Sequence, residues 1–195
     1  MSEITKKAPN YKLLFKLVTL ALCIVIALFI VENKMSRGGA DQQVGLQAIA
    51  VLTPLNGSGV KGQVIFEQRE GYVHVTARVS GLNPNQKHGF HVHHFGDLSD
   101  GNGKSAGPHY NPQGFSHGLP PTEMRHAGSF GNIVADKEGN ALFRLKDTTI
   151  TIKGDYHPAL GRAVVVHANE DTGEQPSGNA GPRIAFGVIG YKHVK

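Results

Sequence analysis

Short segments in which apolar and polar residues alternate, separated by turn signals, restrict the fold of this 195-residue chain more than any other feature. Residues 72–80 (YVHVTARVS) are the clearest case, because an apolar side chain stands at every second position, as in a half-buried β-strand. Eight segments fit a strand: 47–53, 60–68, 72–80, 89–95, 131–136, 140–146, 162–168 and 183–191. Glycine, 25 residues of 195, supplies turns such as Asn56-Gly57 between them. The sequence therefore predicts an all-β fold, an antiparallel sandwich or barrel.

An apolar run near the N-terminus, residues 13–31 (LLFKLVTLALCIVIALFIV), has the length of a transmembrane helix. A helix of this length spans about 28 Å, close to the hydrocarbon thickness of about 30 Å. We expect an uncleaved signal anchor, while a cleaved signal peptide stays an alternative. A lipid on Cys23 is disfavoured by the bulky Leu22 before it. The predicted organisation is a cytoplasmic tail and transmembrane anchor (1–34), a linker (35–45) and a folded domain (46–195).

The charge distribution bears on location and on partners. Four lysines precede or begin the apolar run, and they outnumber Lys34 and Arg37 after it. The positive-inside rule then places the N-terminus in the cytoplasm and the domain outside it, in a periplasm or in a lumenal or extracellular space. The net charge of +5 shrinks to +2 after residue 34, so we expect membrane association through the N-terminal helix and no nucleic-acid partner.

Histidines are concentrated in the folded part, since all 11 follow residue 70. His91 and His93 lie two residues apart in a predicted strand, so their side chains share one face and form half of a copper or zinc site. A long loop, residues 96–130, holds His109, His117 and His126, and His167 ends the apolar strand AVVVH. Surface histidines are the alternative reading of the pair alone. The lone Cys23 excludes both an intrachain disulfide and a thiolate metal cluster.

Five motifs resemble the copper/zinc superoxide dismutase family over nearly all of residues 46–191. They are GFHVHHFGD (89–97), SAGPHYNP (105–112), RHAG (125–128), GRAVVVH (161–167) and GNAGPRIAFGVIG (178–190). The resemblance implies an eight-stranded Greek-key barrel. It also implies superoxide dismutase activity, which converts the superoxide anion to dioxygen and hydrogen peroxide, and it makes a homodimer possible.

The resemblance also assigns roles to individual residues. The implied copper ligands are His91, His93, His109 and His167. His109 would bridge to zinc and take part in proton transfer, and the further zinc ligands would be His117 and His126. Arg183 matches the arginine that guides superoxide, and Asp171 matches a carboxylate that links the copper and zinc ligands through hydrogen bonds. The remaining histidines match no ligand position and are expected to be surface or packing residues: His74, His88, His94, His157 and His193.

Three departures from the family pattern carry expectations of their own. Ser129 stands where the family has a zinc-binding aspartate, so three outcomes are open: weak zinc binding, water as the fourth ligand, or no zinc. Phe186 replaces a disulfide cysteine, a cross-link typically worth about 2–4 kcal/mol. The segment between His167 and Arg183 is short for the family, which would leave the copper more exposed.

Two other functions remain open from the sequence. A membrane-tethered protein that buffers or delivers copper needs the same ligands as the enzyme. An adhesion or interaction module would make the histidines incidental. The complete set of copper ligands together with Arg183 favours the copper-dependent oxidoreductase.

Overall fold

The structure is a computed structural model, and it describes residues 12, 15–16, 18–28 and 44–193. Residues 18–28 are helical, and the Thr19 hydroxyl donates a hydrogen bond to the Phe15 carbonyl (2.9 Å). Within the described residues, no helix combines the length and the apolar character needed to cross a membrane. Parts of the predicted transmembrane run and most of the predicted linker lie outside the described residues.

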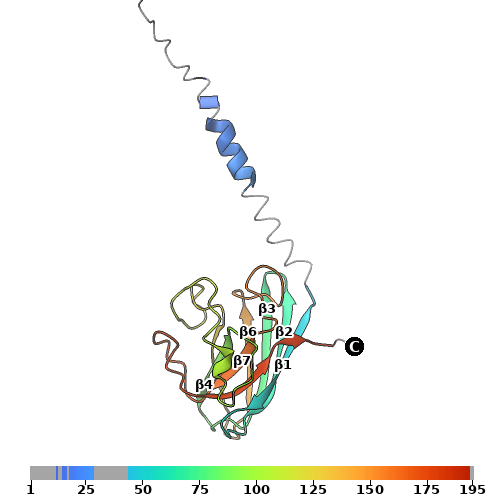
Figure 1. The fold of residues 1–195 in the computed structure, drawn as a ribbon, viewed down its shortest axis with the longest axis vertical. Helices are drawn as coiled ribbons and strands as arrows, with labels where there is room; N and C mark the ends of the chain where they lie inside the picture. The colour runs from blue at the N-terminus through green and yellow to red at the C-terminus, as the bar shows by residue number, and fades with distance from the viewer. Residues whose placement is uncertain (1–11, 13–14, 17, 29–43, 194–195) are drawn as a thin grey trace, which may run out of the picture. The chain divides into compact units, whose positions relative to one another are not determined.

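The described body of the chain, residues 44–193, is built from nine strands and one short 3-10 helix (Figure 1). Their bounds are β1 Gln47–Pro54, β2 Lys61–Arg69, β3 Tyr72–Ser80, β4 Lys87–His93, η1 Lys104–Ala106, β5 Ser129–Val134, β6 Ala141–Asp147, β7 Ala163–His167, β8 Arg183–Val188 and β9 Gly190–Tyr191. The eight longer strands correspond to the eight predicted segments; seven have ends shifted by up to two residues, and β8 ends three residues before the predicted segment 183–191 does.

The strands form a nearly closed antiparallel barrel in the order β5-β4-β7-β8-β1-β2-β3-β6. In Figure 1, β1, β2, β3 and β6 lie side by side, and β4 and β7 belong to the other part of the barrel. Strand β1 joins the two parts, because residues 47–52 pair with β2 whereas Thr53 and Pro54 pair with β8. The predicted all-β barrel is confirmed.

Alternation along the strands builds the core, as the sequence predicts. Along β3, every second side chain is buried, beginning with Val73. Phe90 contacts Phe130 and Phe143 at ring-centroid distances of 5.8 and 5.2 Å, and Phe66 lies 6.4 Å from Phe130. Full burial of a side chain of this size contributes about 1.5–3 kcal/mol.

One predicted strand, residues 183–191, is divided in the structure. Ile189 leaves the β7–β8 ladder, since its N–H donates to the Arg162 carbonyl and its own carbonyl accepts from the Gly161 N–H, both at 2.9 Å. Its side chain is buried in the core. After this bend, β9 pairs with Ala48 and Ile49 of β1. The alternation of the sequence did not reveal the change of partner.

Two long connections leave the same part of the barrel, residues 94–128 after β4 and residues 168–182 after β7. The first contains η1. It corresponds to the long loop predicted over residues 96–130, and loops of this length are usually functional.

Candidate metal centre

Strand β4 provides the first two imidazoles of the site. The side chains of His91 and His93 are buried on one face, whereas Val92 between them joins the hydrophobic core. The long loop brings His109 beside them, through an isolated bridge to His93. His167 comes from the end of β7, whose neighbouring residues pair with β4 in antiparallel register.

These four imidazoles converge on a common point. His91, His93, His109 and His167 each offer a ring nitrogen, and these four atoms all lie within 4.8 Å of one another. The Nε2 atoms of His93 and His167 are 3.3 Å apart, and the ring centroids of His91 and His109 are 4.0 Å apart. Four nitrogen donors at this spacing fit a copper ion.

Hydrogen bonds outside the cluster decide which nitrogen each ring presents. His93 donates from Nδ1 to the Gly107 carbonyl (2.7 Å), and His167 donates from Nδ1 to the Gly181 carbonyl (3.1 Å), so both present Nε2. His91 donates from Nε2 to Asp171 (2.7 Å), which leaves Nδ1 buried without any hydrogen-bond partner. A buried ring nitrogen without a partner is costly, and a metal ion would satisfy it. The residues present therefore fit copper.

A second group shares one member with the first. Nitrogen atoms of His109, His117 and His126 lie within 4.8 Å of one another, so His109 belongs to both groups. The Nδ1 atoms of His126 and His109 are 3.4 Å apart. Three imidazoles are a common zinc ligand set, so a second ion would be held here by nitrogen alone.

Ser129 occupies the position where a fourth ligand to this second ion is expected. It is fully buried, and its Oγ lies 3.2 Å from Nδ1 of His117. Because His117 donates from Nε2 to Asp171, its Nδ1 is an acceptor, and the Ser129 hydroxyl donates to it. The hydroxyl thus occupies the lone pair that a metal ion would need.

Asp171 connects the two groups. Its carboxylate accepts hydrogen bonds from His91 (2.7 Å) and from His117 (2.9 and 3.0 Å). Its main chain is held by Asn132, which donates to the Asp171 carbonyl at 2.9 Å and accepts from its N–H at 2.7 Å. Gly178, with φ +81°, lies directly against Asp171 and His117. A Cβ at Gly178 would lie 1.9 Å from an oxygen of the Asp171 carboxylate. The carboxylate fixes both rings, which is a common role of a residue behind metal ligands.

The electrostatics keep the cluster uncharged and ready to bind a metal. Burial lowers the pKa of several imidazoles below the usual value, and neighbouring imidazoles lower these pKa values further. This holds for His91, His93, His109 and His126. For His167, burial is the largest cause of a pKa of about 3. For Asp171, burial raises the pKa, but the hydrogen bonds from His117 and His91 outweigh it, so the carboxyl pKa lies well below its usual range. Neutral imidazoles beside a carboxylate are the protonation states that metal binding requires.

A pocket of about 560 Å³ opens onto three of the four imidazoles, those of His93, His109 and His167, and its wall also includes Arg183. Among the described residues that line it, Arg183 is the one with a permanent charge. Burial lowers the pKa of its guanidinium, and Asp100 opposes this effect.

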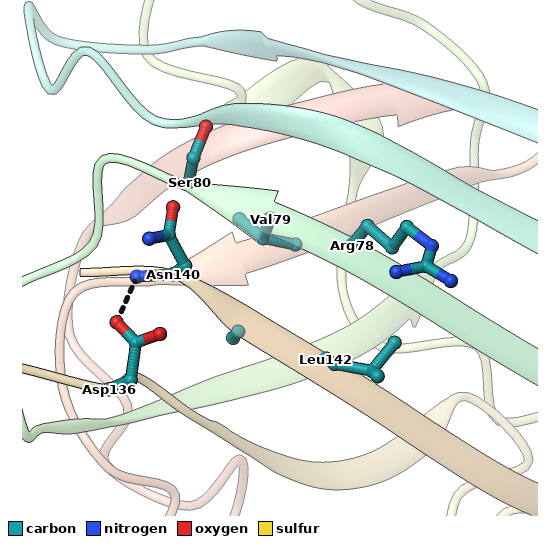
Figure 2. A pocket seen from close by; sticks show the side chains of 7 residues that line it. Arg78, Val79, Ser80, Asp136, Asn140 and Leu142 are labelled. Carbon is teal, nitrogen blue, oxygen red and sulfur yellow. Dashed lines mark hydrogen bonds between the residues drawn. The ribbon is translucent and has the colours of Figure 1, made fainter. Parts of the chain in front are cut away.

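A second hollow of about 340 Å³ lies between β3 and β6 (Figure 2). Figure 2 shows Arg78 and Leu142 along its strands and the Asn140 N–H donating to Asp136 (2.8 Å), with no histidine among its described lining residues.

The sequence-predicted residues thus lie together: the four proposed copper ligands, the three proposed zinc ligands, Asp171 and Arg183. One supporting contact was not predicted. His88 is fully buried, in agreement with the packing role expected for it, and it donates from Nδ1 to the carbonyl of His167 (2.9 Å). Its position three residues before His91 in the same strand was the available signal.

The barrel and its two histidine groups define a class: an all-β metalloprotein with a four-imidazole copper site joined to a three-imidazole site. A family model described as copper/zinc superoxide dismutase matches residues 60–189. The chain belongs to the copper/zinc superoxide dismutase family.

Curated relatives extend the match over most of the chain. A Cu-Zn superoxide dismutase of Paramecium bursaria Chlorella virus 1 is 42% identical over 180 residues, covering 89% of this chain and 93% of that protein. Cu-Zn superoxide dismutase 2 of Brassica juncea is 46% identical over 154 residues, covering 75% and 98%. The Neurospora crassa enzyme is also 46% identical over 154 residues, covering 74% and 97%.

Proposed function

We infer that the protein is a superoxide dismutase. Two superoxide anions and two protons give one dioxygen and one hydrogen peroxide, so one anion is oxidised and the other is reduced. The observation that carries this function is the convergence of four buried imidazoles, one of which, His91, has a ring nitrogen without a partner.

The metal would be held by this chain's own nitrogen atoms. We propose that His91, His93, His109 and His167 bind copper, with His91 through Nδ1 and with His93 and His167 through Nε2. Copper supplies the one-electron chemistry when bound, because it changes between two oxidation states and imidazole suits both. His109, His117 and His126 would hold zinc, more weakly than a site with a carboxylate ligand.

Two side chains act on the reactants. Arg183 is proposed to attract superoxide to the pocket and to hold it there, because its guanidinium is the permanent positive charge of the pocket wall. When the copper-facing nitrogen of His109 is not bound to the metal, it is proposed to hold a proton and to release it to the reduced oxygen species. Asp171 takes no part in the chemistry and orients His91 and His117.

The test is a product balance. The full-length chain is loaded with copper and given a known amount of superoxide without any reductant. Dismutation predicts one dioxygen and one hydrogen peroxide for every two superoxide anions, with the metal-free chain as control. Because superoxide also dismutates slowly without a catalyst, these products should form much faster than with the metal-free chain, and superoxide decay no faster than in that control would contradict the proposed function.

The location of the protein is a further proposal. We propose that the apolar run 13–31 anchors the chain in a membrane and that the domain lies on the extracytoplasmic side. The apolar sequence, interrupted only by Lys16 and Thr19, and the lysines at its N-terminal side support this. Full-length protein should stay with membranes after an alkaline wash, and a variant lacking residues 1–34 should be released. Equal release of both would contradict the anchor.

A second copy of the chain is the proposed protein partner. Val51, Phe95 and Val188 are apolar and are 63, 52 and 39% exposed. Val188 lies beside Gly96, the residue that follows Phe95, because a Cβ on Gly96 would lie 3.3 Å from Val188 Cγ1. Sedimentation should give a dimer that Val188→Asp dissociates, and a monomeric wild-type chain would contradict this.

A further inference from the structure

A small apolar cluster lies on the outer face of β7 and β8, separate from the main core. Alternation sends Val164 and Val166 into the main core, and it sends Ala163 and Val165 to the opposite face, together with Phe186 of β8. We call this second group the loop cluster. Its members are Leu55, Leu98, Ala106, Ala163, Val165 and Phe186. Strand β7 is therefore buried at every position.

The loop cluster fastens the loop that follows β4 to the barrel. Ala106 is fully buried in it, and Leu98 packs against it from the same loop. Leu55 reaches the loop from the end of β1, and a Cβ on Gly103 would lie 2.8 Å from Leu55 Cδ1. Gly103 also has φ +75°, a conformation that L side chains rarely adopt. Leu55 therefore packs directly against the main chain at Gly103.

The same stretch of main chain holds the head of Arg183. The guanidinium donates one hydrogen bond to the Gly103 carbonyl and another to the Gly107 carbonyl, the latter at 2.5 Å. The stem of Arg183 passes close by, since a Cβ on Gly103 would lie 3.2 Å from Arg183 Cδ. The direction of the guanidinium is thus set by two carbonyls of a loop, and the loop is held by apolar packing.

The main chain of Arg183 is fastened through the segment that contains Leu55. The Leu55 N–H donates to the Ile184 carbonyl (2.8 Å), and the Asn56 side chain donates to the Arg183 carbonyl (3.0 Å). The Ser58 hydroxyl also donates to Ile184 (2.6 Å). Leu55 therefore contacts both the strand that carries Arg183 and the loop that receives its guanidinium.

We propose that Leu55 and Phe186 are positioning residues for Arg183: they hold residues 103–107 against β8, so that two carbonyls aim the guanidinium at the copper pocket. The inference rests on the proposed role of Arg183 in attracting superoxide. The chain has no cysteine after Cys23, so this attachment is entirely non-covalent.

The experiment compares variants of the full-length, copper-loaded chain by the second-order rate constant for superoxide at several ionic strengths. Leu55→Ala should lower this constant by about 3- to 10-fold, up to the lower limit of the 10–10³ range of electrostatic steering because the charge itself is kept, and should flatten its salt dependence. The copper content should be unchanged, and Leu55→Met should keep the wild-type rate and salt dependence. Phe186→Leu is a milder second variant with the same expected direction.

Leu82→Ala is the matched control, because Leu82 is equally buried, at 4% exposure, but belongs to the main core. It should lower the thermal stability and keep the salt dependence of the rate. An equal change of the salt dependence in Leu82→Ala and Leu55→Ala would overturn the proposal, since general loosening would then explain both.

A double variant separates this inference from the role of Arg183. If Leu55 acts through Arg183, Leu55→Ala combined with Arg183→Ala should match Arg183→Ala alone. If the two substitutions instead lower the rate constant independently, so that their effects multiply in the double variant, the positioning role is overturned. It is also overturned if Arg183→Ala is slow while Leu55→Ala is fully active. A fully active Arg183→Ala would instead overturn the proposed role of Arg183 and this inference with it.

Discussion

His93 and Arg183 donate to the same carbonyl oxygen, that of Gly107. The His93 Nδ1 lies 2.7 Å from this oxygen and the Arg183 Nη2 lies 2.5 Å from it. One acceptor therefore sets the tautomer of a proposed copper ligand and the position of the proposed anion-binding group. The loop that presents Gly107 thus holds His93 and Arg183 in a fixed relation to each other.

Removing the guanidinium tests its role in capturing the anion. Arg183→Ala should lower the second-order rate constant for superoxide by about 10-fold or more and should weaken its dependence on ionic strength. Arg183→Lys should retain part of the salt dependence, because it keeps the charge and loses the two-carbonyl geometry. Metal analysis should find unchanged copper in both. An unaltered rate in Arg183→Ala would remove the residue from the account.

The carboxylate behind the two metal groups is the second target. Asp171→Asn removes the negative charge and replaces one acceptor oxygen with an NH2 donor, so His91 and His117 are held by weaker hydrogen bonds. We expect copper affinity to fall by about 10- to 100-fold, as is common for residues that orient ligands. Competition with a chelator measures it. Asp155→Asn, at an exposed acid, is the control, and equal copper affinity of the two variants would contradict the linking role.

Zinc retention should depend on Ser129. Ser129→Asp supplies an anionic oxygen in place of a neutral hydroxyl and should raise the zinc content, after extensive dialysis, toward one per chain. Ser129→Ala removes the hydroxyl bonded to Nδ1 of His117 and should not lower zinc below the wild-type value. Elemental analysis decides, and a wild-type chain that already keeps one zinc would show that the serine site is sufficient.

The metal-free protein should become less stable in acid. The pKa of His167 is about 3 in the folded chain and 6.5 as its ordinary value, so unfolding takes up a proton between these two pH values. The contribution of this group to the free energy of unfolding is therefore fully present above about pH 6.5. It declines by about 1.4 kcal/mol per pH unit for each such group as the pH falls toward 3. Urea midpoints between pH 7.5 and 4.5 measure this, with His167→Gln expected to reduce the slope. A constant midpoint would contradict the lowered pKa.

Much of the barrel could be predicted because its signals are local. Alternation located β3 and the shared face of His91 and His93, and the unbroken apolar run of β7 was consistent with burial on both faces. The bend at Ile189 could not be predicted, because it depends on hydrogen bonds to residues 161 and 162, which meet it only in the folded barrel.

For the site, too, the features encoded locally in the sequence could be predicted, and those that depend on contacts between distant segments could not. Its histidines, Asp171 and Arg183 were identified from motifs along the chain. The ring nitrogen that each imidazole presents was not, since it depends on carbonyls such as Gly107 and Gly181, which distant loops supply. The bond between Ser129 and His117, and the packing of Leu55 on Gly103, likewise require positions in space that no spacing in the sequence encodes.

Catalysis by copper at the four imidazoles is tested most directly by titration of the metal-free, full-length chain with copper while superoxide decay is followed. The account predicts a decay rate that rises in proportion to bound copper and stops rising at one ion per chain, and no such rise for His167→Gln. Stoichiometric copper binding without faster decay would contradict it and would leave a protein that stores or delivers copper.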